Sequence, residues 1–212
     1  NRVQICTSID GPEHLHDKQR KLVGSSAFKA AVYWIKRINA AYGERGLVRS
    51  HICCFDVFGQ PGTWQDACCL FPLEQMILMT YDDPGWVHEF LRILQARKMV
   101  YIRSMAGACY DLVELGGGAA SSTVISPKLF EQFVAPYDCE LIRLAHAAGQ
   151  RIAYHTCGGM MPILEQIAVM EPDAMETFTP KGMGGDVDLA AAKRRIGDKV
   201  CMIGGFDQYH FL

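Results

Sequence analysis

The stretch RIAYHTCGG, residues 151–159, decides the fold prediction for this chain. It begins as a short apolar run and ends in two glycines, which is typical of a buried strand that leads into a loop. Residues two apart on a strand point to the same side, so His155 and Cys157 are expected to project together. Where parallel strands are joined by helices, active sites lie at the carboxyl ends of the strands. The sequence therefore predicts a functional site at this strand end.

The segments around this stretch alternate between strands and helices. The pattern predicts strands at 111–116, 151–156, 174–178 and 200–205, and helices at 126–149, 162–170 and 186–196. Pro136 must kink the first of these helices or divide it in two. Such short alternation indicates parallel strands joined by crossover helices. The strand ends at Gly116, His155, Glu176 and Gly205 are then expected on one face of a barrel, because right-handed crossovers bring them to one side.

The amino-terminal half has a less regular pattern. It predicts a helix at 25–42, a strand at 47–55 and two later helices, the second beginning at Asp83-Pro84. The total of about five strands falls short of the eight that close a barrel. Either the sheet is open or the chain is a piece of a (β/α)8 TIM-type barrel. We expect an α/β fold in which residues 1–212 form a single barrel domain, truncated at both ends.

Composition narrows the class of protein. The chain has 212 residues, of which 50% are hydrophobic and 21% charged, as in soluble globular proteins. Its net charge of −2, from 21 basic and 23 acidic residues, gives no electrostatic signature of a nucleic-acid partner or an anionic membrane surface. No apolar run of about 20 residues is present to span a bilayer. Small-molecule partners are therefore expected.

The cysteines indicate a reducing compartment. Of the nine, Cys53-Cys54 and Cys68-Cys69 are adjacent pairs, which rarely form disulfides. We expect these four to be reduced and the protein to be cytoplasmic. Cys201 lies four residues before the end of its strand at Gly205, and it is predicted to pack in the core.

His155 and Cys157 could together bind a metal. Imidazole and thiolate both suit zinc, which accepts them in one tetrahedron. The spacing alone leaves open a second interpretation, in which the histidine is hydrogen-bonded in the core beside a small apolar thiol. A zinc site would also need a third ligand.

A family resemblance adds to this reading. It rests on five motifs in order: SPKLF (126–130), PY (136–137), His146 with Gly149, HTCG (155–158) and GGFD (204–207). Together they resemble the uroporphyrinogen decarboxylase family in its broad sense, over about half of the chain, from Asp111 to Asp207. That family includes porphyrinogen decarboxylases and the methanol- and methylamine-specific coenzyme M methyltransferases.

The resemblance implies a (β/α)8 barrel and, through the methyltransferases, a zinc site. In those enzymes the equivalents of His155 and Cys157 bind zinc with a further cysteine from a later strand, which here is expected beyond Leu212. Zinc would lower the pKa of a coordinated thiol so that a thiolate can take or hold a methyl group. A corrinoid carried by a partner protein would exchange that methyl group with a small-molecule donor or acceptor, or a reduced folate would accept it.

Four further residues near strand ends are candidates for the site. Glu176 is a candidate base or substrate contact, or else a solvated carboxylate at a loop edge. Asp207 and His210 follow the Gly204-Gly205 strand end, and the resemblance favours Asp207 as catalytic and leaves His210 as a substrate contact. Glu114 precedes a glycine-rich loop whose amides could hold an anionic group of the substrate, although such glycines are as often only turns.

Two other functions remain open at this point. The chain could be a metal-free uroporphyrinogen decarboxylase, in which an acidic side chain stabilises a protonated pyrrole. The arginine-rich amino-terminal segment that those enzymes use to grip substrate carboxylates is not recognisable here. The chain could also be a barrel that binds a ligand without catalysis, since a fold does not fix a function. The metal content of the protein distinguishes the zinc-dependent methyltransferase from the metal-free decarboxylase. Turnover with any methyl donor would exclude the non-catalytic barrel.

Overall fold

The computed structural model describes residues 13–19, 22–57, 59–108 and 110–211. The chain divides into two compact units, residues 1–48 and 49–212. The single barrel domain expected over the whole chain stays a prediction.

The first unit is helical. It contains α1 (Glu13–Gln19), α2 (Ala27–Tyr42) and the short 3-10 helix η1 (Gly43–Arg45). The helix predicted at 25–42 is thereby confirmed. Asp17 accepts a hydrogen bond from the backbone N–H of Phe28 at 2.8 Å, and Lys29 pairs with Glu13 at 3.0 Å. These two contacts link α1 to the start of α2.

The second unit is built on one parallel sheet. Its strands are β1 (Arg49–His51), β2 (Leu112–Gly116), β3 (Ile152–His155), β4 (Ala174–Thr177) and β5 (Cys201–Gly204), hydrogen-bonded in that order. Every neighbouring pair is parallel. Strands that follow one another in both sequence and space, with helices between them, form an incomplete TIM-type barrel, as predicted.

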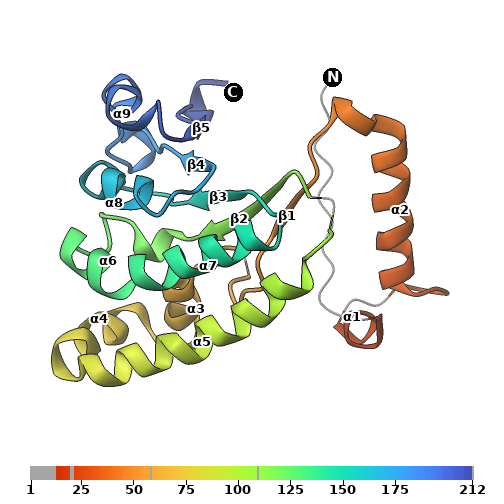
Figure 1. Ribbon diagram of the computed structural model, residues 1–212, viewed down its shortest axis with the longest axis horizontal. Helices are drawn as coiled ribbons and strands as arrows, with labels where there is room; N and C mark the ends of the chain where they lie inside the picture. The colour runs from red at the N-terminus through yellow and green to blue at the C-terminus, as the bar shows by residue number, and fades with distance from the viewer. Residues whose placement is uncertain (1–12, 20–21, 58, 109, 212) are drawn as a thin grey trace. The chain divides into compact units, whose positions relative to one another are not determined.

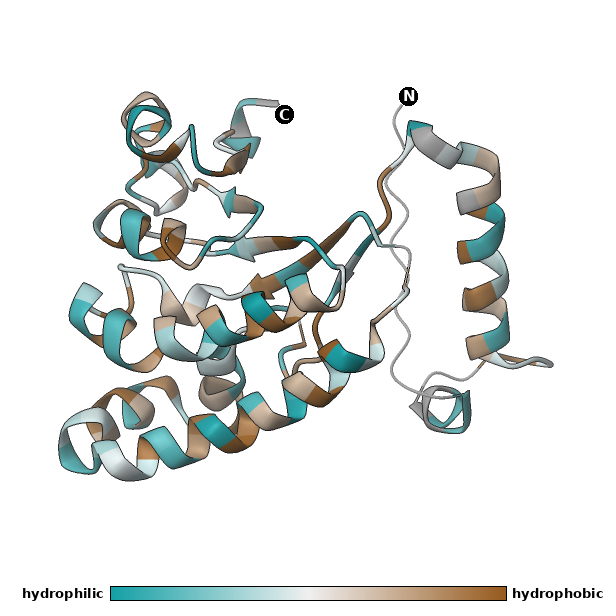
Figure 2. Cartoon of the chain, viewed as in Figure 1, coloured by the Kyte–Doolittle hydropathy of each residue, from teal (hydrophilic) through white to brown (hydrophobic). Residues whose placement is uncertain are grey.

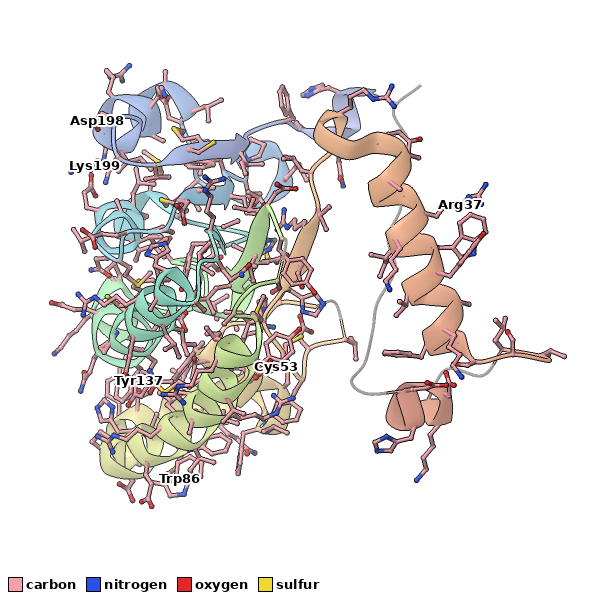
Figure 3. The ribbon with its side chains drawn as sticks, turned by 45° about the vertical axis from the view of Figure 1, so that its right-hand side comes forward. Arg37, Cys53, Trp86, Tyr137, Asp198 and Lys199 are labelled. Atoms are coloured by element: carbon pink, nitrogen blue, oxygen red, sulfur yellow. The ribbon has the colours of Figure 1, made fainter. Side chains whose placement is uncertain are left out.

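Helices connect these strands. They are α3 (Thr63–Leu70), α4 (Leu73–Asp82), α5 (Pro84–Ser104), α6 (Pro127–Phe133), α7 (Ala135–Ala147), α8 (Leu164–Ala168) and α9 (Leu189–Ile196), with 3-10 turns η2 (Gly118–Ala120), η3 (Met161–Ile163), η4 (Lys181–Met183) and η5 (Gln208–Phe211). Figure 1 shows β3, β4 and β5 one above the other, with α8 and α9 to their left. On α5 and α7, His88 Nδ1 lies 2.7 Å from the hydroxyl of Tyr137, which is labelled in Figure 3. None of the described helices is long and apolar enough to cross a membrane.

Prolines set the boundaries that the sequence pattern left uncertain. Pro136 separates α6 from α7, as predicted, because proline lacks the N–H that would continue the helix. Between β1 and β2 the sequence predicted two helices, but the structure has three. Pro72 follows the end of α3 and precedes α4, so one predicted helix is really two.

The two faces of the sheet differ in chemistry. Side chains on one face are fully buried against the helices, as expected from period-two alternation: Val113, Leu115, Ile152, Tyr154 and Met175. Figure 2 shows brown, hydrophobic segments among the strands of this unit. The opposite face carries the charged side chains of β1 to β4.

The core position predicted for Cys201 is wrong. Its side chain is exposed, although its strand is the one predicted. The register pairs Cys201 with Ala174 and Ile203 with Glu176, and paired residues of parallel strands share a face. Cys201 therefore lies on the charged face, away from the covering helices. Cys53, Cys54, Cys68 and Cys69 are free thiols.

Candidate active site at the strand ends

The strand register brings the predicted site residues together. Gly116 of β2 pairs with His155 of β3, which pairs with Glu176 of β4. Glu114 lies two residues before Gly116 and shares its face. A Cβ at Gly116, where φ is +103°, would collide with the backbone of His155, so glycine is required there. The prediction that these strand ends share one face is confirmed for these residues, and Gly205 follows the neighbouring strand.

Arg49 of β1 joins the two carboxylates. Its guanidinium donates to Glu114 Oε2 at 2.7 Å and to Glu176 Oε2 at 2.8 Å, and it also contacts Glu176 Oε1. The hydrogen bonds to Glu176 raise the pKa of Arg49 despite its burial. Sequence reasoning missed Arg49, which lies 127 positions from Glu176. The sequence does place Arg49, a cation, on the predicted strand at 47–55, and this is the pattern that could have pointed to it.

His155 is bound to the carboxylates through one ring nitrogen. Its Nδ1 lies 2.9 Å from Glu176 Oε1 and 3.4 Å from Glu114 Oε1, and because a carboxylate only accepts, Nδ1 carries the proton. Its Nε2 is buried and has no hydrogen-bond partner within the described residues. Burial opposes the charge, yet Cys157, Glu176 and Glu114 raise the pKa of His155 to about 10.

Glu176 is the anchor of this arrangement. Burial alone would raise its pKa, but hydrogen bonds from His155 and Arg49 lower the pKa to about 2. Glu176 is only 5% exposed to solvent. Two cationic partners thus keep a buried carboxylate ionised, which gives His155 a fixed acceptor.

Cys157 lies beside the His155 ring. Its interaction with His155, ahead of the opposing effect of burial, lowers the pKa of the thiol. The Gln60 Nε2 atom lies 3.7 Å from the sulfur. The predicted common direction of His155 and Cys157 therefore holds in the structure. Their role as metal ligands stays a prediction.

The donor atoms offer two places for a metal ion. Ligand atoms of Glu114, His155 and Glu176 lie within 4.8 Å of one another. Arg49 already binds both carboxylates, however, and its positive charge opposes a second cation there. The other place is beside the unpartnered Nε2 of His155 and the Cys157 sulfur, which together suit zinc. Glu176 would then orient the ring through Nδ1, as carboxylates behind zinc-binding histidines do.

Asp207 and His210 belong to a different part of the chain. They follow β5, and the imidazole Nδ1 lies 3.6 Å from the carboxylate. The metal-capable group found among the described residues does not include either side chain. His210 is largely exposed. Their predicted catalytic and substrate-binding roles stay predictions.

The glycine-rich loop after Glu114 is already held by glutamines. Gly118 donates its N–H to Gln60 Oε1 at 2.8 Å, and Ala119 donates to Gln65 Oε1 at 2.9 Å. These two amides are therefore engaged by side chains, not open to an anion. The substrate contact expected of Glu114 stays a prediction.

Comparisons with known proteins agree with this geometry. Residues 61–212 match the family described as Uroporphyrinogen decarboxylase (URO-D). Uroporphyrinogen decarboxylases of Chlorobaculum tepidum and Chlorobaculum parvum are 26% and 25% identical over 130 residues, which is 61% of this chain and 35% of each relative. The chain thus spans about a third of the length of these curated relatives.

A solved structure gives the same fold. A methyltransferase from Methanosarcina mazei superposes with a TM-score of 0.64 at 18% identity, covering 84% of this chain and 48% of the other. At that identity the likeness concerns the fold alone. Since the family match covers most of the chain, including the strand ends that carry His155 and Glu176, this chain belongs to the uroporphyrinogen decarboxylase family.

Proposed function

We propose that this chain supplies part of the active site of a zinc-dependent methyltransferase or demethylase that works with a corrinoid carried by a partner protein. One observation carries the proposal. The buried Nε2 of His155 meets no geometric hydrogen-bond criterion with the described residues, although the ring interacts with the Cys157 thiol, so the imidazole and the thiol form a partly buried pair of soft donors. Such a pair points to a ligand from outside the chain.

The donor set fits zinc. Nε2 of His155 and the sulfur of Cys157 would hold it, and both are favoured zinc ligands. A bound zinc ion would lower the pKa of a coordinated thiol and so make a thiolate available at neutral pH. A reducing cytoplasm would keep Cys157 as a thiol.

The surrounding residues have roles that do not depend on the metal. Glu176 accepts the Nδ1 proton of His155 and so directs Nε2 away from the carboxylates. Arg49 holds Glu176 and Glu114 in place and balances their charge. We therefore assign Glu176 and Arg49 a positioning role. The small-molecule methyl donor or acceptor would contact the charged face of the sheet.

Uroporphyrinogen decarboxylation is the second candidate. The curated relatives from Chlorobaculum carry that name, which favours it. One observation opposes it. The guanidinium of Arg49 already donates hydrogen bonds to Glu114 and Glu176, so it has few donors left for a substrate carboxylate.

Turnover tests the choice between the two. The zinc-loaded full chain is mixed with methylcobalamin and a small thiol, and separately with uroporphyrinogen. We expect loss of the methyl–cobalt absorbance with formation of a methyl thioether. His155→Gln should abolish this, whereas His146→Gln is the matched control, because His146 also pairs with a carboxylate, that of Asp173 at 2.9 Å. Decarboxylation of uroporphyrinogen by metal-free protein, without methyl transfer, would contradict the proposal.

A further inference from the structure

Gln60 lies between β1 and α3, and hydrogen bonds hold the residues around it. Its own backbone N–H donates to Asp56 Oδ2 at 3.1 Å. Two residues later, Gly62 donates to the carbonyl of Gly116 at 2.6 Å, and a Cβ at Gly62 would lie 2.9 Å from that backbone. The loop therefore lies directly against the end of β2, and the position of the Gln60 side chain is fixed relative to the site.

The orientation of the Gln60 amide follows from its partners. A backbone N–H can only donate, so the atom 2.8 Å from Gly118 N must be the amide oxygen. The other end of the amide is then the NH2 group, which lies 3.7 Å from the Cys157 sulfur. A sulfur atom accepts such a donor. The amide is thus a directed N–H donor to the thiol.

Gly118 makes this arrangement possible. A Cβ at Gly118 would collide with the Cys157 sulfur and lie 3.5 Å from Gln60 Oε1. The glycine lets the loop approach both side chains at once. The Cys157 sulfur is therefore enclosed by the His155 ring, the Gln60 amide and the backbone of Gly118.

We infer that Gln60 is a positioning residue that holds the Cys157 sulfur beside the His155 ring through an N–H···S hydrogen bond. This inference rests on the proposed function for its consequence, a preformed pair of metal ligands. The hydrogen bond itself does not depend on the metal. Because outer contacts of this kind change metal affinity by about 10- to 100-fold when removed, Gln60 should matter well beyond its own loop.

Gln65 provides a matched control. It accepts the equivalent bond from the same loop, from Ala119 N to its Oε1 at 2.9 Å, and its side chain interacts with a thiol elsewhere, that of Cys69, whose pKa is raised by burial. If Gln60 only anchors the loop, Gln60→Leu and Gln65→Leu should have similar effects on Cys157. Gln60→Glu keeps an acceptor for Gly118 but replaces the donor beside the sulfur with a carboxylate oxygen.

The experiment measures two quantities in the full chain. The first is the alkylation rate of Cys157 by iodoacetamide in metal-free protein, followed by peptide mass spectrometry. We expect Gln60→Leu to slow it several-fold and Gln60→Glu to slow it further, because the carboxylate repels the developing thiolate, with Gln65→Leu unchanged. The second is zinc affinity, which should fall by about tenfold in both Gln60 variants.

The two readouts separate the claims. If unmodified protein binds no zinc, the proposed function fails, while the alkylation contrast still decides the role of Gln60. If folded Gln60→Leu and Gln60→Glu alkylate like Gln65→Leu, the inference about Gln60 is wrong, whether or not zinc binds.

Discussion

Two ionic clusters in the second unit differ in a way that separates fold from function. Asp66 of α3 and Lys98 of α5 are both fully buried and lie 2.6 Å apart. Asp66 also accepts from Phe55 N at 2.7 Å, and Lys98 donates to the carbonyl of Cys53, labelled in Figure 3, at 2.8 Å. The two charges neutralise each other within the chain, and their hydrogen bonds join the segment after β1 to α3 and α5.

In the cluster at the strand ends, the charged and polar atoms are only partly paired within the chain. Arg49, Glu114, Glu176 and His155 Nδ1 bind one another, but His155 Nε2 has no hydrogen-bond partner within the described residues. Its members are also partly open to solvent, whereas Asp66 and Lys98 are not. A cluster enclosed by its own chain holds the fold, and a cluster that solvent can reach is suited to a ligand.

Breaking the buried pair should have the largest effect. Lys98→Met removes the buried partner of Asp66, leaves only the more distant Arg97 at 3.7 Å, and is expected to lower the free energy of unfolding by about 3–5 kcal/mol, measured by urea denaturation. Asp66→Leu combined with Lys98→Met should recover most of the loss. A single variant destabilised by less than about 1 kcal/mol would mean that the pair is not what holds the loop.

Altering the strand-end cluster should affect metal binding more than stability. Glu176→Gln removes the charged acceptor behind His155 and should lower zinc affinity by about 10- to 100-fold, measured by competition with a chelator. Glu165→Gln is the control, because Glu165 also pairs with an arginine, Arg195, at 2.6 Å but on the surface. Equal affinities in the two variants would remove the positioning role of Glu176.

The charge of His155 should give the metal-free protein a smaller, pH-dependent effect. Its pKa is raised from 6.5 to about 10 in the folded state. A raised pKa contributes stability that is complete below the unfolded value and is lost as pH rises through the folded value. Glu176, with a pKa lowered to about 2, stays ionised throughout this range.

Urea denaturation between pH 6.5 and pH 10 measures this contribution. The free energy of unfolding should decline across the range in the unmodified metal-free protein, and less steeply in His155→Gln. Parallel pH profiles for the two proteins would show that the site residues do not hold the charge on His155.

Cys201→Ala should have the smallest effect. Its side chain is exposed at the last strand, so stability should change by no more than about 0.5 kcal/mol in thermal or urea unfolding. Zinc content should not change. A loss of several kcal/mol would restore the core position that the structure contradicts.

The sequence predicted the fold well because its signals are local. Alternation around 151–159, the cap at Ser126 and the break at Pro136 are short-range patterns, and each corresponds to an observed boundary. Pro72 is also a local helix-breaking residue. It separates two apolar helical segments, α3 and α4, where the sequence pattern predicts one helix. Cys201 lies on the predicted strand, but its side chain is exposed, because the position of a residue along a strand does not tell whether its face is covered.

The candidate site was predictable only in part. His155, Cys157, Glu114 and Glu176 lie at strand ends, which the alternation locates. Arg49 and Gln60 act through partners 127 and 97 positions away in sequence, a relation that follows from strand register and loop packing. No local pattern carries that information.

The metal content of Cys157→Ala tests the account most directly. Zinc is measured in the unmodified full-length protein, which includes any cysteine beyond Leu212, and in its Cys157→Ala and Cys201→Ala variants. Zinc binding worth about 10–16 kcal/mol is shared among few ligands, so loss of one should lower the affinity by orders of magnitude. We predict about one zinc per chain in the unmodified protein and in Cys201→Ala, and little in Cys157→Ala. Stoichiometric zinc in Cys157→Ala, or none in the unmodified protein, would contradict the zinc–thiolate site.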